Sequence, residues 1–188
     1  DKEIKQIMNR ISKNYEIIYI NDASKDNSFA ELKKLKDVKI INLNRNYGQA
    51  TALDAGFKES VGEIVISMDG DGQNDPADIP RLLKKLKEED LDVVAGWRQT
   101  RADKGGIKIL TRIGRALRKS LISDGVHDTG CTLRVYKKEV IKSLDLQGEM
   151  HRYILALLKW KGFRIGELIV NDRVREHGVS KYGYSKAV

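Results

Sequence analysis

The sequence has 188 residues, of which 40% are hydrophobic and 33% are charged, and its formal net charge is +8. A chain of this length can bury the core of one domain, and its composition excludes an intrinsically disordered protein. The positive charge favours an anionic partner, a class that includes phosphorylated substrates, anionic membrane surfaces and nucleic acids.

The cysteine and histidine content excludes two kinds of stabilising site. A single cysteine, Cys131, cannot form an internal disulfide, and the three scattered histidines do not have the spacing of a zinc site. The sequence also has no run of about 18 apolar residues and no signal peptide, so we expect no membrane span within it.

Strands and helices alternate along the first half of the sequence. Apolar residues at three- and four-residue spacing predict a helix at 4–11. Short apolar runs predict strands at 16–21, 38–43, 64–68 and 92–97, and helices are expected between them at 29–35, 48–60 and 78–88. We expect Asp26 or Asn27 to cap the first of these three helices and Asp78 to cap the last. The alternation predicts an α/β fold, with a parallel sheet covered by helices on both faces.

The second half is less regular, and its first element is a predicted helix at 108–121 with two different faces. One face carries Lys108, Arg112, Arg115 and Lys119, and the opposite face carries Leu110, Ile113, Leu117 and Leu121. Two interpretations stay open: a surface helix with a solvated basic face, or a helix that binds anionic lipid or a substrate phosphate. We then expect a turn at 127–131, strands at 132–136 and 163–170, a helix at 149–161 and a basic tail from 171.

The stretch 64–76, which reads I-V-I-S-M-D-G-D-G-Q-N-D-P, places two carboxylates at the end of an apolar strand. The run 64–68 is typical of a strand buried on both faces. Asp69 and Asp71 follow it, at the end of the strand where ligands of open α/β sheets bind, and the adjacent glycines allow the backbone to bend. Hard oxygen ligands of this kind suit Mg²⁺ or Mn²⁺ that bridges to a diphosphate.

Two simpler interpretations of this stretch are a calcium loop and an ordinary turn. A helix-loop-helix calcium site needs Gly at its sixth position and Glu at its twelfth, where the sequence has Asn74 and Pro80. The calcium loop is therefore excluded. An acidic turn stays open, because Asp and Gly are common in turns for local reasons.

Seven segments, in order and in register, resemble the family 2 glycosyltransferases with the GT-A fold. Within that family they are similar to the polyprenyl-phosphate group, which includes dolichol-phosphate mannose synthases and undecaprenyl-phosphate sugar transferases. The segments read E-I-I-Y-I-N-D-A-S-K-D-N-S, N-R-N-Y-G-Q-A-T-A-L-D-A-G-F, S-M-D-G-D-G-Q-N-D-P, G-W-R, H-D-T-G-C-T-L-R-V-Y, G-E-M-H-R-Y-I and R-E-H-G-V-S-K-Y-G.

The resemblance implies a single GT-A domain over 1–188, which is a Rossmann-like, mostly parallel sheet between helices. It also implies inverting transfer of a sugar from a nucleoside-diphosphate sugar to a dolichyl or undecaprenyl phosphate, with Mg²⁺ or Mn²⁺, at the cytoplasmic face of a membrane. Family members begin with a strand before the first helix, and many continue into transmembrane helices. We therefore expect 1–188 to lack the family's first strand and any C-terminal membrane segment.

The resemblance also assigns roles to particular residues. The metal ligands would be Asp69, Asp71 and Gln73, and the catalytic residues Asp71, Arg98 and Arg112. The nucleotide-sugar site would comprise Asp22, Ser24, Asn46, Gly48, Asp69, Asp71, Arg175 and Lys181. The acceptor site would comprise Arg98, Arg112, Arg115, Glu149, His151 and Arg152. From the residues alone, a loop carboxylate is the favoured interpretation of Asp22. For Glu149, His151 and Arg152, helix capping or surface pairing is an equal alternative.

The acceptor implied by the resemblance does not require a general base. A phosphate monoester has a second pKa near about 6, so it is largely a dianion at neutral pH and needs binding by arginine rather than deprotonation. Relatives that glycosylate sugar hydroxyls have a catalytic Asp in an E-D pair, and here Glu149 is followed by Met150.

Three other functions were weighed against this one. Transfer to a sugar hydroxyl in polysaccharide synthesis is the nearest alternative. A nucleotidyltransferase would need a Gly- and Arg-rich phosphate loop near the start, which the sequence lacks. A nucleic-acid-binding module is suggested by the charge, but aromatic content is only 6% and no stacking platform is visible, so we expect no nucleic-acid partner.

Overall fold

The structure is a computed structural model that describes residues 1–12, 14–99 and 126–174. Its strands are β1 (Ile18–Asn21), β2 (Lys39–Asn42), β3 (Ile64–Ser67), β4 (Val93–Trp97), β5 (Arg134–Lys137) and β6 (Ile165–Ile169). Its helices are α1 (Lys2–Ile11), α2 (Ser28–Leu32), α3 (Gln49–Glu59), α4 (Ile79–Glu88), α6 (Lys138–Lys142) and α7 (Ile154–Trp160), with 3-10 turns η1 (Pro76–Asp78) and η2 (Met150–Tyr153).

The strands form two sheets, a parallel pair β1-β2 and a four-stranded sheet in the order β3-β5-β4-β6. β3 and β4 each pair antiparallel with β5, whereas β6 pairs parallel with β4. Three of the four strands therefore run in one direction, and β5 runs against them. The predicted α/β fold with a mostly parallel sheet is confirmed, and the reversed strand β5 is the feature that the alternating pattern did not predict.

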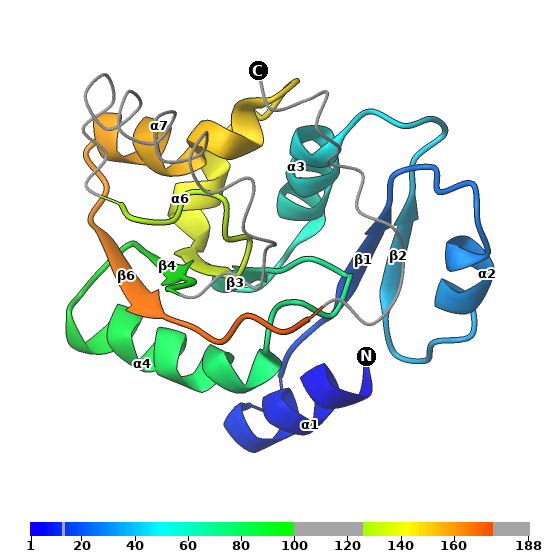
Figure 1. Cartoon of the computed structure of the whole chain (residues 1–188), viewed down its shortest axis with the longest axis horizontal. Helices are drawn as coiled ribbons and strands as arrows, with labels where there is room; N and C mark the ends of the chain where they lie inside the picture. Colours follow the sequence, from blue (N-terminus) through cyan, green and yellow to red (C-terminus); the bar gives the residue numbers. More distant parts are fainter. Residues whose placement is uncertain (13, 100–125, 175–188) are drawn as a thin grey trace.

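Helices cover both faces of the sheets (Figure 1), with α1 and α4 on one face and α3, α6 and α7 on the other. α3 contacts both sheets: Gly56 lies against Ile20 of β1, and the Phe57 ring meets Tyr136 of β5 edge-on, with ring centroids 5.4 Å apart. A Cβ at position 56 would come within 2.8 Å of Ile20, so a glycine allows this close approach.

The core consists of two apolar clusters, one on each face of the four-stranded sheet. Alternate residues of a strand point to opposite faces. Accordingly Val93 and Tyr136 pack with the helices α3, α6 and α7, and Val94 and Val135 pack with α4. The sheet is thus packed against helices on both faces. The loops that follow its strands lie outside this core and can carry polar residues.

Several expectations about single elements were wrong. β3 was expected to be buried on both faces, yet Ile64 is 46% exposed because β3 has a strand neighbour on one side only among the described residues. The helix expected at 149–161 is divided into η2 and α7, and the short helix α6 was not predicted. Asp78 lies at the N-cap position of α4 without capping it, because its carboxylate accepts hydrogen bonds from Asn171 and Arg81.

The predicted basic helix at 108–121 and the basic segment at 175–183 lie outside the described residues. In the part of the chain that is described, no helix has both the length and the apolar character needed to cross a membrane.

Candidate functional site

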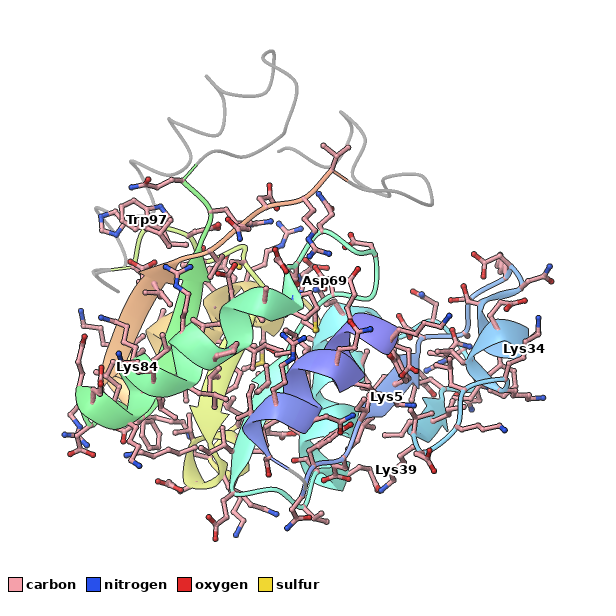
Figure 2. The ribbon with its side chains drawn as sticks, turned by 90° about the horizontal axis from the view of Figure 1, so that it is seen from below. Lys5, Lys34, Lys39, Asp69, Lys84 and Trp97 are labelled. Carbon is pink, nitrogen blue, oxygen red and sulfur yellow. The ribbon has the colours of Figure 1, made fainter. Side chains whose placement is uncertain are left out.

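The polar residues singled out in the sequence follow strands that end at one edge of the molecule. Asp22 comes directly after β1, and Arg98 directly after β4. In Figure 2, Trp97 and Asp69 lie above Lys39, the first residue of β2, which is low in the view. The carboxyl ends of the strands β1, β3 and β4 therefore present their loops at the edge where open α/β sheets bind ligands.

The acidic loop after β3 is held in a defined shape by its own polar groups. The Asp69 N–H donates to Asn74 Oδ1 at 2.9 Å, and an Asp69 carboxylate oxygen accepts a hydrogen bond from Gln49 Nε2 at 3.1 Å. The Gln73 N–H donates to Asp71 Oδ1 at 3.0 Å, and Gly72 between them has φ of 81°. The loop is a tight turn that keeps Asp69, Asp71 and Gln73 together.

The electrostatics of this loop fit a divalent cation. Burial raises the pKa of Asp69, a hydrogen bond from Thr132 opposes the rise, and the negative charge of Asp71 adds to it. Two partly buried carboxylates that repel each other are stabilised by a shared cation. The oxygen donors of Asp69, Asp71 and Gln73 suit Mg²⁺ or Mn²⁺. The described residues contain no cluster of three Asp, Glu, His or Cys, so such a cation would also take oxygens from a substrate or water.

Asp22, Asn46 and Gly48 are brought together at the start of α3. The Asp22 carboxylate accepts hydrogen bonds from the main-chain N–H groups of Tyr47 at 2.7 Å and Gly48 at 2.9 Å. The Asn46 side-chain amide donates to the Asp22 carbonyl at 3.0 Å. Ser24 lies on the same loop as Asp22, and its N–H donates to the Asn21 side chain at 3.2 Å. In this structure the Asp22 carboxylate fixes the loop at 44–48.

Arg98 is largely but not fully buried, and its guanidinium is bound by a carboxylate that the sequence interpretation did not include. Arg98 Nε lies 2.8 Å from Asp128 Oδ2, and Nη2 lies 3.2 Å from Asp128 Oδ1. Arg98 Nη1 is 3.9 Å from Asp172, and the side chain is 11% exposed. Burial alone would lower the pKa of Arg98, but the hydrogen bonds and charge of Asp128 outweigh it and raise the pKa.

The other predicted acceptor residues cluster in η2, which lies between α3 and α7. Arg152 Nε forms an ion pair with Glu149 at 3.1 Å, and both side chains are largely exposed. His151 is half-buried, and burial lowers its pKa, which keeps the imidazole neutral at pH 7. The structure therefore brings these three residues together. Arg112, Arg115, Arg175 and Lys181 lie outside the described residues.

Three polar side chains support the acidic loop and were missed in the sequence; Asn74 is buried, and Gln49 and Thr132 are partly buried. Asn74 Oδ1 accepts from Asp69 N–H and from Thr132 Oγ1, the latter at 3.0 Å. Gln49 reaches the same loop from α3. A signal for Asn74 was present, because it directly follows the motif, whereas Gln49 and Thr132 are distant in sequence and their contacts depend on the fold.

The segment after β6 is tied across the acidic loop. The Arg173 N–H donates to the Gln73 carbonyl at 2.9 Å, and Arg173 Nη2 pairs with Asp75 at 2.6 Å. The Asn171 N–H donates to Asp78 at 2.7 Å. We call residues 171–173 the strap. It carries the chain from β6 past the loop that contains Gln73.

The family profile "Glycosyl transferase family 2" matches residues 2–145 of this chain. Among curated proteins, the chain is similar to dodecaprenyl-phosphate galacturonate synthase of Rhizobium johnstonii, with 38% identity over 182 residues, 92% of this chain and 53% of that protein. It is also similar to undecaprenyl-phosphate 4-deoxy-4-formamido-L-arabinose transferase of Edwardsiella ictaluri, with 36% identity, 95% of this chain and 56% of that protein. The chain thus spans about half the length of these relatives.

Solved structures of glucosyl-3-phosphoglycerate synthase from Mycobacterium tuberculosis have the same fold. A complex with Mn²⁺, UDP and glucosyl-3-phosphoglycerate superposes with a TM-score of 0.73, at 15% identity, over 95% of this chain and 67% of that chain. Another structure of the same enzyme gives a TM-score of 0.73 at 16% identity, over 99% of this chain and 69% of that one. At this identity the likeness concerns the fold alone.

Proposed function

Because the chain belongs to glycosyl transferase family 2, we propose that it moves a sugar from a nucleoside-diphosphate sugar to a polyprenyl phosphate, with inversion at the anomeric carbon. The observation that supports this most directly is the acidic loop, where a partly buried Asp69 stands beside Asp71 after the carboxyl end of β3. Two relatives named as polyprenyl-phosphate sugar enzymes support the choice of acceptor.

The departing diphosphate is the group that must be stabilised when the anomeric bond breaks. A divalent cation, Mg²⁺ or Mn²⁺, would offset the negative charge that develops on it. Asp71 with Asp69 and Gln73 would hold this cation. The partly buried hydrogen bonds that Asp69 donates to Asn74 and accepts from Gln49 hold the loop in place before the substrate arrives, which reduces the cost of rearranging it.

The donor nucleotide would bind against the loops that follow β1 and β2. Asp22, Asn46 and Gly48 form one hydrogen-bonded group there, and Ser24 lies on the same loop as Asp22, which supports their joint assignment. For Asp22 to contact a nucleobase, its carboxylate must share the oxygens that now accept N–H groups from the loop at 44–48. Arg175 and Lys181 are proposed for the diphosphate on their sequence pattern.

The acceptor phosphate would bind near Arg98, Arg112 and Arg115, with Glu149, His151 and Arg152 beside it. Arg98 is fixed by Asp128, so its position is set before the acceptor binds. No base is required, because the acceptor phosphate is itself the nucleophile and is largely a dianion at neutral pH. This mechanism distinguishes the proposal from the alternative, transfer to a neutral sugar hydroxyl, which needs a carboxylate base.

The site of action proposed for the protein is the cytoplasmic face of a membrane, where the lipid phosphate is accessible. The net charge of +8 favours a peripheral contact with anionic lipid headgroups.

The test is a donor screen with UDP- and GDP-sugars and a short polyprenyl phosphate, in the presence of Mg²⁺ or Mn²⁺. Asp71→Asn should lose transfer activity, by a factor that corresponds to about 2–4 kcal/mol of transition-state stabilisation. Asp37→Asn is the matched control, since Asp37 is exposed and its φ of 55° suits asparagine equally well. A near-normal rate of transfer in the presence of a chelator would contradict the metal-dependent mechanism.

A further inference from the structure

Glu167 of β6 is a carboxylate at a strand position whose neighbours on the same face of the sheet are apolar. β6 pairs parallel with β4 in a register that sets Glu167 beside Ala95, and both Ala95 and Ile165 pack in the cluster under α3, α6 and α7. The Glu167 side chain is only 12% exposed. A carboxylate in such a position loses hydration and needs hydrogen bonds to compensate. The groups that supply those bonds therefore indicate its role.

Both carboxylate oxygens of Glu167 accept hydrogen bonds from the chain segment that returns beside β4. The His127 N–H donates to Oε1 at 2.8 Å and to Oε2 at 2.9 Å, and the Asp128 N–H donates to Oε1 at 3.2 Å. The His127 ring nitrogen Nδ1 lies 2.8 Å from Oε2. One side chain thus fixes two consecutive main-chain N–H groups of a distant segment, and hydrogen bonds to a charged acceptor are among the stronger ones.

Two further contacts hold the segment 126–128 in the same place. The His127 imidazole stacks on the indole of Trp97, which is labelled in Figure 2, with ring centroids 4.2 Å apart and an angle of 13° between the planes. The Val126 side chain is buried in the apolar cluster that contains Ala95. The position of this segment is therefore set by β4 and β6 together.

The segment carries Asp128, which holds the guanidinium of Arg98. The Asp128 carboxylate accepts hydrogen bonds from Arg98 Nε at 2.8 Å and Nη2 at 3.2 Å, and from the main-chain N–H groups of Arg98 at 3.3 Å and Gly130 at 3.0 Å. A bidentate guanidinium–carboxylate pair has strict geometry, so a shift of the Asp128 main chain moves the Arg98 guanidinium with it. The contacts thus run from Glu167 through Asp128 to Arg98.

We propose that Glu167 is a positioning residue for the acceptor phosphate: through the main chain at 127–128 it fixes Asp128, and thereby the placement of the Arg98 guanidinium. This rests on the proposed function, in which Arg98 binds the acceptor phosphate. A binding group displaced by about 1 Å can cost about 100-fold in rate, so a loosened segment should weaken acceptor binding. The donor nucleotide, against the loops that follow β1 and β2, should bind as before.

A carboxylate that only stabilised the sheet would have different consequences. Its loss would lower the melting temperature and would affect donor and acceptor binding alike. A carboxylate that positions Arg98 affects acceptor binding alone, and its effect depends on the bidentate contact between Arg98 and Asp128. The two roles are therefore separated by the choice of ligand and by the coupling between Glu167 and Arg98, and not by stability.

The first measurement is calorimetric titration of wild type, Glu167→Met and Glu167→Gln with a short-chain prenyl phosphate, and separately with UDP and Mn²⁺. Glu167→Met lacks both acceptor oxygens and should bind the prenyl phosphate about 10-fold more weakly, with UDP binding unchanged. Glu167→Gln keeps one oxygen for the two main-chain N–H groups and should lie between wild type and Glu167→Met. It also carries the test if Glu167→Met does not fold.

The matched control is Glu16→Met. Glu16 Oε1 also accepts a main-chain N–H, that of Val61 at 2.7 Å, but the two residues precede β1 and β3 and so lie at the amino ends of these strands. Glu16→Met should leave both affinities unchanged. Wild-type affinity for the prenyl phosphate in both Glu167 variants, or an equal weakening of UDP binding, would overturn the proposal.

The second measurement combines Glu167→Met with Arg98→Lys, which keeps the charge but cannot form the bidentate contact with Asp128. If each single variant weakens prenyl phosphate binding about 10-fold, the double variant should also weaken it about 10-fold, whereas independent roles would give about 100-fold. Multiplied losses would overturn the proposal. Failure of the proposed function would appear in wild type itself, which would then bind the prenyl phosphate no more tightly than the matching prenol.

Discussion

Cys131 packs tightly against Gly96 near the end of β4. A Cβ added to Gly96 would lie 2.9 Å from Cys131 Sγ and 3.0 Å from the Leu133 carbonyl oxygen, so position 96 accepts no larger residue without a backbone shift. Burial raises the pKa of the Cys131 thiol from 9.0 to about 11. The thiol is therefore an apolar packing group here, and the folded protein disfavours its ionised form.

We expect this thiol to make stability depend on alkaline pH. The thiol ionises at pH 9.0 in the unfolded protein and only at about pH 11 in the folded protein. Its contribution to the free energy of unfolding is therefore fully present below pH 9.0 and is lost as the pH rises toward about 11, because the unfolded state ionises first. Between about pH 8 and about pH 10, wild type should lose roughly 1 kcal/mol more unfolding free energy than Cys131→Ala. Urea unfolding at both pH values measures the difference. If wild type and Cys131→Ala lose the same amount of unfolding free energy between the two pH values, the thiol does not cause the pH dependence.

Arg98 and Glu149 provide a direct test of the base-free mechanism. We expect Glu149→Gln to retain most activity, because Glu149 is an exposed partner of Arg152, whereas Arg98→Ala removes a buried cation and leaves Asp128 unpaired. Arg98→Lys should be more active than Arg98→Ala and less active than wild type, because lysine keeps the charge but cannot form the bidentate hydrogen bond to Asp128. Saturating turnover in wild type should rise through about pH 6 and then flatten, following the second ionisation of the acceptor.

The measurement is a pH profile of turnover for the four proteins. If Glu149→Gln abolishes transfer while Arg98→Ala remains active, a protein base exists and the proposed mechanism is wrong.

Among single residues, the sequence predicted the polar residues that directly follow the strands and missed the side chains that form hydrogen bonds or ion pairs with them. The metal loop was visible because its polar residues are contiguous. Asp128 was not visible as the partner of Arg98, because the two are 30 positions apart and their contact depends on how the chain returns beside β4. The assignments to Asp69, Asp71 and Gln73 remain predictions until a metal titration is made.

The strap connects three elements that are far apart in the sequence. Arg173 contacts Gln73 through its main chain, Asp75 through one nitrogen and Glu3 of α1 through another, with both ion pairs at 2.6 Å. α1 is thus linked to the metal loop through one side chain. Because a surrounding shell of hydrogen bonds orients metal ligands, loss of the strap should loosen the position of Gln73.

We expect Arg173→Met to raise severalfold the Mn²⁺ concentration needed for half-maximal binding of a nucleotide sugar. The matched control is Arg164→Met, which removes an exposed arginine paired with Asp90 and Asp92 at the other end of the sheet. Calorimetric Mn²⁺ titration with UDP-sugar present makes the comparison. An equal Mn²⁺ requirement in the two variants would mean that the strap does not position the loop.

Helices and strands were predictable where the sequence pattern that indicates them lies within the element itself. α1 was predicted from apolar residues at helical spacing, and α4 from the start signals at Asp78 and Pro80; both helices occur close to the expected bounds. The direction of β5 was not predictable, because its pairing with β3 and β4 depends on residues more than 30 positions away. The break between η2 and α7 was missed because apolar periodicity continues through it.

The charge of the whole molecule suits attachment to an anionic surface. Vesicles that contain anionic lipid should bind the chain at low salt and release it as salt rises, since screening shortens electrostatic reach to about 10 Å at 0.1 M. The predicted helix at 108–121 is the proposed contact. Replacing Arg112 and Arg115 with Gln should therefore weaken vesicle binding, as measured by co-sedimentation.

The control for this prediction removes the same amount of charge elsewhere. Lys34, in the turn after α2, and Lys84 of α4 are exposed and well separated from each other in Figure 2, and their replacement with Gln should have a smaller effect. If the two double variants bind vesicles equally, the attachment depends on total charge and not on the predicted helix.

The stacking of Trp97 on His127 makes the site optically distinct from the rest of the protein. The two rings are nearly parallel, with centroids 4.2 Å apart, and His127 Nδ1 lies 2.8 Å from Glu167. The sequence contains two tryptophans, and the other, Trp160, is 84% exposed at the end of α7. An aqueous quencher should therefore reach Trp160 first, and the emission that remains should come from Trp97. With Trp160 replaced by Phe, the intrinsic fluorescence of the chain becomes that of one indole next to Arg98, so substrate binding can be followed by light without any added label.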